Sequence, residues 1–119
     1  MSLAAQVPAG VTAALVVNDV IQMVKIPDDA IIFDVTLYTD DLDESTGLVL
    51  DVGDGTVTDR FIDGATIGQT GGIARMNEAG GAGYTYTADD TIDVKVQVAP
   101  TTGTATGTVG LIVTYGFES

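Results

Sequence analysis

The stretch VGDGTVTDRFIDG, residues 52–64, holds the densest group of side chains that could bind a cation or catalyse a reaction. It places Asp54, Asp59 and Asp63 around two Asp-Gly pairs, with Arg60 as its one basic residue. Carboxylates at such spacing suit a calcium loop or a catalytic pair of acids. Asp-Gly pairs also supply the positive φ angles that tight turns require, so the spacing has to decide between these interpretations.

Calcium binding in the EF-hand manner is excluded by the spacing. That loop requires acidic or amide residues at its first, third and fifth positions and glycine at the sixth. Counted from Asp51, the third and fifth positions are Gly53 and Gly55, so the pattern fails. A calcium site of another type would draw on Asp51, Asp54 and Asp59, and it stays open as the alternative.

The interpretation that the sequence favours is a structural corner between two strands. In it Asp54 and Gly55 form the turn, and Arg60 makes a local ion pair with its neighbours Asp59 and Asp63. No metal ion is then needed to hold the corner.

Catalysis has few candidate residues. The chain has no His, Cys or Trp, so it lacks the commonest general base, the best nucleophile and an aromatic platform for sugars. The acidic run at 40–44 is typical of a solvated turn, and no serine lies in a nucleophile elbow. We therefore expect no catalytic residue, no metal and no cofactor.

The charge balance limits the class of partner. Seventeen acidic residues against four basic ones give a net charge of −13. Such a surface repels nucleic-acid phosphates and anionic membranes, so we expect neither as a partner.

The Gly-rich segment 80–83 does not match a nucleotide-binding loop. It is followed by Tyr-Thr-Tyr rather than by Gly-Lys-Ser/Thr, and it predicts an ordinary loop. No segment reads as a signal peptide or as a membrane helix.

Apolar residues alternate with a period of two along much of the chain. Successive side chains of a strand point to opposite faces, so alternate apolar residues mark a buried face. The clearest such sets are Ile31, Phe33, Val35 and Leu37; Leu48, Leu50 and Val52; Ile92, Val94, Val96 and Val98; and Val109, Leu111, Val113, Tyr115 and Phe117. Weaker strands are predicted near 11–17, 20–26, 57–62, 71–76 and 84–87. The pattern predicts an all-β fold, a single jelly-roll-like β-sandwich of about eight short strands.

Residues 1–119 are predicted to form one domain, because no linker or internal repeat interrupts the pattern. The mean hydropathy is positive although the net charge is strongly negative. This combination indicates that apolar surface meets a partner, most simply another copy of the chain.

Two segments are candidate interfaces. Residues 1–17, with Leu3, Val7 and Val11, are apolar and weakly patterned, and they suggest a contact arm. We expect the paired strands to begin later, so that removing residues 1–10 would weaken attachment and leave the sandwich folded. The second candidate is the Gly-rich segment 68–83, with Arg75, Met76 and Asn77.

The order of several motifs resembles that of small structural proteins of tailed bacteriophages, specifically capsid cement or head decoration proteins. The motifs are KIPDDAIIFDV, then LVLDVGDGTVTDRFIDG, GGIARMN, AGYTYTADDTIDVKV and TGTATGTVGLIVTYG. Together they cover about residues 24–117, whereas the first 20 or so residues match no such pattern.

The resemblance implies a function without chemistry. Such proteins bind the outer surface of the phage head, where the major capsid protein is their partner. They typically form homotrimers that span neighbouring capsomers, and they offer no catalytic residue to carry over. Two alternatives stay open: a tail or fibre component of the virion, and an adhesin-type β-sandwich that binds calcium or sugar.

Overall fold

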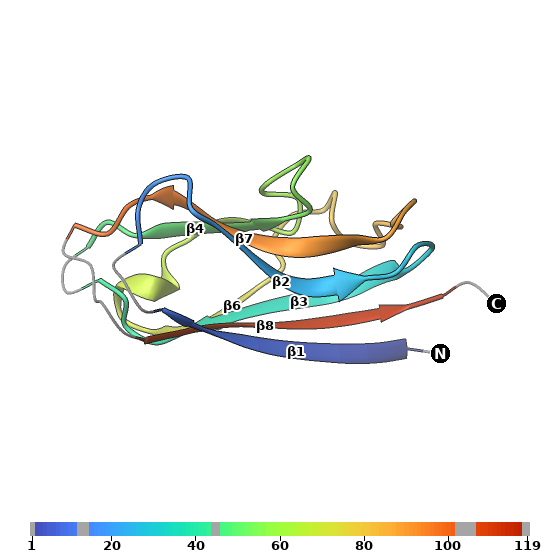
Figure 1. Cartoon of the computed structure of the whole chain (residues 1–119), viewed down its shortest axis with the longest axis horizontal. Helices are drawn as coiled ribbons and strands as arrows, with labels where there is room; N and C mark the ends of the chain where they lie inside the picture. Colours follow the sequence, from blue (N-terminus) through green and yellow to red (C-terminus); the bar gives the residue numbers. More distant parts are fainter. Residues whose placement is uncertain (1, 12–14, 44–45, 102–106, 118–119) are drawn as a thin grey trace.

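Two four-stranded antiparallel sheets lie face to face in the computed structural model, which describes residues 2–11, 15–43, 46–101 and 107–117 (Figure 1). The β1 sheet has the strand order β1-β8-β3-β6, and the β2 sheet has the order β2-β7-β4-β5. The strands are β1 (Ser2–Val11), β2 (Val20–Ile26), β3 (Ile31–Thr39), β4 (Val49–Gly53), β5 (Ile62–Ala65), β6 (Gly72–Arg75), β7 (Asp90–Val98) and β8 (Gly107–Gly116). A short 3-10 helix, η1 (Ile67–Gln69), precedes β6.

The pairing is that of a jelly roll. Strands β1 and β8, β2 and β7, β3 and β6, and β4 and β5 pair as successive rungs of one long antiparallel hairpin. This hairpin rolls up, so that β3 also pairs with β8 and β4 also pairs with β7. The prediction of an all-β, jelly-roll-like sandwich of about eight strands is therefore confirmed.

The core lies between the two sheets and is built from alternate residues of the central strands. Burial of these apolar side chains supplies the main favourable term for folding, since the chain has no disulfide. The fully buried members include Val35 and Leu37 of β3, Leu50 and Val52 of β4, Ile92, Val94 and Val96 of β7, and Val109, Leu111 and Val113 of β8. Phe61, from the loop between β4 and β5, is the largest of the fully buried side chains.

Several predicted buried positions are wrong, for local reasons. The register of β3 against β8 shifts between Ile32 and Asp34, so a bulge moves the core position from Phe33 to Ile32. Ile32 is fully buried, whereas Phe33 is 48% exposed. Val98 and Phe117 lie beyond the core at strand ends and are also exposed.

Three predicted strands also need correction. Residues 57–61 form a loop, and β5 begins only at residue 62. In place of a strand at 84–87, one isolated bridge joins Thr85 to Ile31. Of the predicted strand at 11–17, residue 11 ends β1, residues 15–17 lie outside any strand, and 12–14 are outside the described residues.

The N-terminal segment is not an unpaired arm. Strand β1 pairs with β8 over ten register positions, from Ser2 opposite Gly116 to Val11 opposite Gly107. It forms an edge of its sheet, where a proline such as Pro8 is tolerated because one side of an edge strand needs no backbone donor. The prediction that the paired strands start after this segment is wrong.

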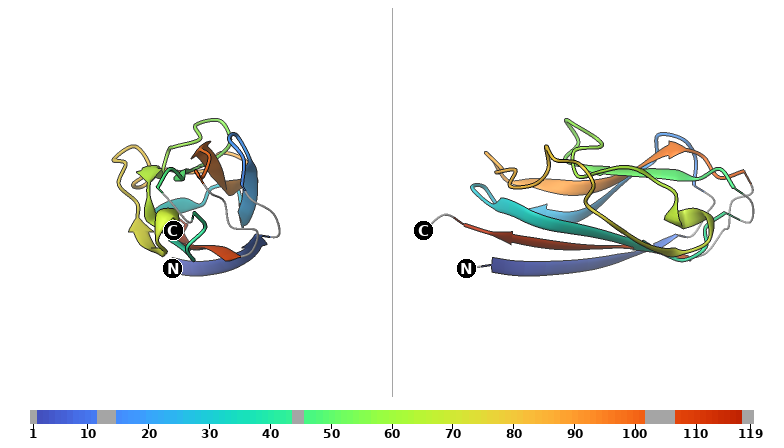
Figure 2. Two further views of the ribbon diagram at one scale, coloured as in Figure 1. Left: turned by 90° about the vertical axis from the view of Figure 1, so that its left-hand side faces the viewer. Right: turned by 180° about the vertical axis from the view of Figure 1, so that it is seen from behind.

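The molecule is elongated, with principal extents of 47 × 21 × 20 Å. Figure 2 shows it end-on, where the strands surround a closed cross-section, and from behind, where the two sheets run along the long axis. Among the described residues, no helix is long and apolar enough to cross a bilayer.

Candidate functional site

The acidic stretch singled out in the sequence forms the corner between β4 and β5. In Figure 1 this loop, coloured green, rises above β7 on the outer side of the β2 sheet. Asp54 is only 5% exposed, and its Oδ1 accepts hydrogen bonds from the backbone N–H groups of Thr56 (3.1 Å) and Val57 (2.8 Å). The next residue, Gly55, has a φ of 88°, which a side chain would disfavour. The carboxylate of Asp54 thus organises the turn.

Arg60 is held inside this corner by two partners. Its Nε donates to Oδ2 of Asp54, so the ion pair is made with Asp54 and not with Asp59 or Asp63 as the sequence suggested. On its other side the guanidinium carbon lies 3.9 Å from the centre of the Tyr84 ring. This cation–π contact ties the 80–86 loop to the corner.

Two further carboxylates lie buried on the outer side of the β2 sheet. Asp51 and Asp93 alternate with core-facing neighbours in β4 and β7, and Gly55 of the corner loop lies against Asp93. Asp51 accepts a hydrogen bond from the backbone N–H of Gly64 (2.9 Å), and Asp93 accepts one from Oγ1 of Thr91 (2.6 Å). Burial raises the pKa of both carboxyl groups above the usual aspartate value, because the charged form loses water. Nearby aspartates add to both shifts.

Within the described part of the chain, no group of three or more potential ligands is placed to hold a metal ion. Asp51, Asp54 and Asp59, the residues of the calcium alternative, therefore do not form one shared ligand set. The oxygens of Asp54 and Asp51 instead accept hydrogen bonds from the corner itself.

The second acidic run is structural as well, which the sequence did not predict. Asp43 is buried, and its Oδ2 accepts hydrogen bonds from the backbone of Leu48 (3.0 Å) and Thr101 (3.1 Å). Asp40 accepts one from the backbone of Thr108 (2.9 Å). These bonds fasten the connections at one end of the sandwich, so the run is not a freely solvated turn.

The residues of the first candidate interface lie in a paired strand. Leu3, Val7 and Val11 lie in β1 at register positions opposite Tyr115, Leu111 and Gly107 of β8. Since β1 is a paired edge strand, a contact with a partner through it stays a prediction.

Of the second candidate segment, Arg75 is exposed and pairs with Asp34 at 2.9 Å. Met76 packs against the core. Asn77 exchanges two hydrogen bonds with the backbone of Asp63, at 3.0 and 3.2 Å, and so supports the start of β5. Arg75 and Asn77 are therefore both exposed, whereas Met76 is partly buried.

Among the described residues, large apolar side chains are exposed both inside the two candidate segments, at Ile73, Val16 and Val17, and outside them. Ile73 of β6 is the most exposed, at 68%. The others are Val16, Val17, Val20, Phe33, Val57, Val98 and Phe117. Ile73 could have been recognised from its position in a strand, because it alternates with Ala74, which packs against the core.

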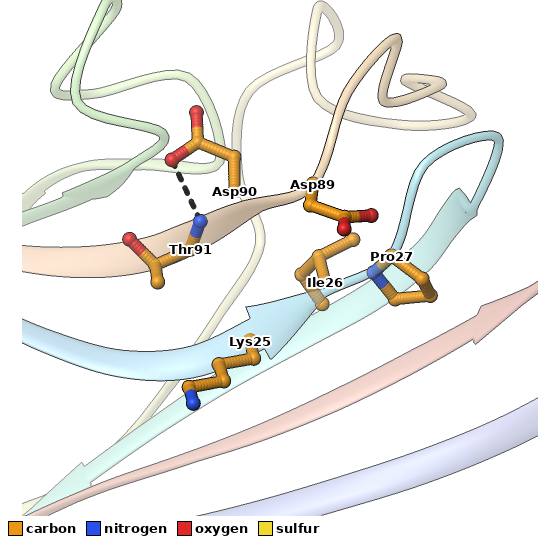
Figure 3. Close-up of a pocket in the computed structure, with 6 residues that line it drawn as sticks. All are labelled: Lys25, Ile26, Pro27, Asp89, Asp90 and Thr91. Atoms are coloured by element: carbon orange, nitrogen blue, oxygen red, sulfur yellow. Dashed lines mark hydrogen bonds between the residues drawn. The ribbon is translucent and has the colours of Figure 1, made fainter.

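A surface hollow of about 420 Å³ lies between the end of β2 and the start of β7 (Figure 3). It is lined by Lys25, Ile26, Pro27, Asp89, Asp90 and Thr91. Figure 3 shows Lys25 and Asp90 pointing away from each other, and the Asp90 carboxylate accepts the hydrogen bond of the adjacent Thr91 N–H. Small-molecule sites have polar groups that converge on the ligand. The polar groups of this hollow do not converge, so it lacks that property of a small-molecule site.

Chains of solved phage capsids share this fold over nearly its whole length. One, from the structure of the cyanophage Pam1 capsid asymmetric unit, is 26% identical with a TM-score of 0.88, covering 98% of this chain and 85% of that chain. Another, from the capsid of Ralstonia phage GP4, is 25% identical with a TM-score of 0.90, covering 100% and 86%. A third, from the acidic stable capsid structure of Helicobacter pylori bacteriophage KHP30, is 20% identical with a TM-score of 0.63 and supports the fold alone, covering 100% and 95%.

No model of a known protein family matches the chain, and no curated protein matches it. The structural neighbours confirm the resemblance to phage capsid-associated proteins that the motifs indicated. The first two neighbours support the assignment of this chain to the structural proteins of phage virions, and they point to a structural rather than an enzymatic role.

Proposed function

We propose that this protein is a cement or decoration protein, which binds the outer surface of a tailed-phage head and stabilises the shell. The observation that carries the proposal is the full-length similarity to chains of the Pam1 and GP4 capsid structures. The partner is the major capsid protein, and the protein performs no chemistry.

The charge supports the outer surface over the interior of the head. A chain with a net charge of −13 that lined the inside would face packed DNA phosphates and be repelled by them. On the outside the same charge keeps the protein soluble until it meets its site.

Stabilisation of the shell arises from several contacts made together. We propose that the chain acts as a homotrimer, so that each assembly engages several capsid subunits. A contact of standard size buries about 1,600 Å², and each further contact is made at a raised effective concentration. Rupture of the shell must then break many joints at once.

The test compares phage heads with and without the protein under heating and osmotic shock, together with a cryo-electron microscopy map of the virion. We expect heads that lack the protein to rupture at lower temperature, and density for the protein on the outer face in trimeric clusters. Equal rupture thresholds, or density confined to the tail, would refute the proposal. The second result would favour the tail or fibre alternative.

A further inference from the structure

The β1 sheet has no net charge in a chain whose net charge is −13. Strands β1 and β8 contain no Asp, Glu, Lys or Arg, while β3 contains only Asp34 and β6 only Arg75. These two residues form an ion pair at 2.9 Å, so the single acid of the sheet is matched by its single base. The other acidic residues of the described chain lie outside this sheet: in the β2 sheet, in the corner loop and in the connections.

The outward residues of β8, β3 and β6 form one face on which the only charged side chains are the paired Asp34 and Arg75. Cross-strand pairing aligns Tyr38 with Gly110 and with Ile73, and aligns Thr36 with Ile112. The Tyr38 ring lies directly over Gly110, where a Cβ would fall within 1.8 Å of the ring. An aromatic ring therefore fills the space that the glycine leaves, beside the 68% exposed Ile73.

We name this surface the neutral face. It consists of Thr36, Tyr38, Ile73, Ile112 and Thr114 together with the Asp34–Arg75 ion pair, whose members lie opposite Thr114 and Thr36. A solvated sheet face in a strongly acidic protein would be expected to carry charged residues. Depletion of charge together with tyrosine and exposed aliphatic side chains is the composition of the buried centre of a protein interface.

The outer side of the β2 sheet differs. It carries Asp51, Asp93 and Lys95, and the corner loop with Asp54 and Asp59 covers part of it. Two copies that met through this side, or through the acidic connections at the ends of the sandwich, would bring like charges together.

We infer that copies of this chain associate with one another through the neutral face. This inference rests on the self-association of the proposed function and assigns the surface that mediates it. The charge favours a second copy of the chain as the molecule that binds this face. Two molecules that each carry a net charge of −13 repel each other, and the repulsion is weakest where neither surface carries a net charge. The acidic surfaces then stay free for a partner with basic residues.

The test is the oligomeric state of the full-length protein at micromolar concentration, measured by sedimentation velocity. We expect Ile73→Glu to weaken self-association at least about 100-fold, because an unpaired carboxylate is strongly disfavoured in a desolvated contact. Thr114→Glu provides a second variant on the same face. Val20→Glu is the matched control: Val20 is 53% exposed and lies on the edge strand of the other sheet, opposite Lys95, and we expect a change below about 3-fold.

Circular dichroism establishes first that the variants are folded. A second measurement uses salt: screening of the body charges should strengthen association as the ionic strength rises from 50 to 500 mM. A wild-type chain that is monomeric at every concentration, wild-type-like assembly of both face variants, or dissociation by Val20→Glu alone would overturn the inference.

Attachment to heads, measured separately, distinguishes the two proposals. A wild-type chain that assembles but binds no heads would refute the proposed function and leave the neutral face as the self-contact. Face variants that stay assembled but lose head binding would assign the face to the capsid, which overturns this inference while supporting the proposed function.

Discussion

Replacing Asp54 by alanine should destabilise the fold through the corner loop. The side chain is nearly inaccessible to water, and it accepts two backbone hydrogen bonds as well as the Nε–H of Arg60. Alanine leaves two turn N–H groups without their acceptor and leaves Arg60 without its counter-ion. Hydrogen bonds to a charged group contribute about 1.5–3 kcal/mol each to stability.

The expected total is below the sum of three such bonds, because Arg60 is 20% exposed and can regain water when its partner is removed. We expect the free energy of unfolding to fall by about 3 kcal/mol. The unfolding entropy of about 2.1 cal/mol/K per residue corresponds to roughly 0.25 kcal/mol/K for 119 residues. The melting temperature should then fall by about 12 °C.

Two further variants separate the contributions. Asp54→Asn keeps an oxygen for the turn N–H groups and loses only the charge opposite Arg60, so its melting temperature should lie between those of wild type and Asp54→Ala. Asp59→Ala removes the same charge from the same loop without touching the ion pair, and it should change stability by less than about 0.5 kcal/mol.

The assay is calorimetry at pH 7 and one fixed protein concentration, since self-association makes the melting temperature depend on concentration. If Asp54→Ala and Asp59→Ala melt within about 2 °C of each other, the carboxylate of Asp54 does not organise the corner.

Four other outcomes are expected. Addition of 1 mM calcium or of a chelator should move the melting temperature by less than about 1 °C; a shift of several degrees would restore the calcium alternative. Asp51→Asn should melt above wild type at pH 7, because the raised pKa of this buried carboxyl means that its ionisation opposes folding. The advantage should shrink as the pH falls toward 4, where the folded wild type takes up the proton more readily than the unfolded chain; an advantage that grows on acidification would contradict the sign. Deletion of residues 2–11 removes the partner along one side of β8 and should abolish the cooperative thermal transition seen by circular dichroism, so a truncated chain with wild-type melting would show that β1 is dispensable. Gly53→Ala places a Cβ within 2.1 Å of the backbone of the corner loop and should lower the melting temperature strongly, whereas Gly80→Ala meets no atom within 4 Å and should be nearly neutral; equal melting of the two variants would reject that packing.

The sequence alone determined the fold class and most of the core. Period-two alternation is a direct consequence of strand geometry, so it identified the buried faces of β7 and β8 from local pattern. It failed at Phe33, because a bulge changes the register of β3 against β8 and nothing in the local pattern marks the extra residue. It also failed at β1, whose weak alternation gave no sign of a partner strand about 100 positions later.

The tertiary structure alone decided the roles of the charged residues. The sequence predicted a solvated turn at Asp43 and a structural corner at Asp54, but it did not show that both carboxylates are buried and accept backbone hydrogen bonds. Whether a carboxylate is solvated depends on which loop covers it, and that in turn depends on how the strands pair. Arg60 likewise pairs with Asp54, six positions away, and not with its neighbour Asp59. This choice of partner also depends on how the loop folds over the strands.

The neutral face shows the same division. That strands β1 and β8 lack charge is visible in the sequence, but they lie at opposite ends of the chain and next to each other in the sheet. Only the rolled hairpin joins them to β3 and β6 in one sheet and brings Asp34 within ion-pair distance of Arg75. Composition is a property of each strand, whereas a surface is a property of the register between strands, and register is set by non-local packing.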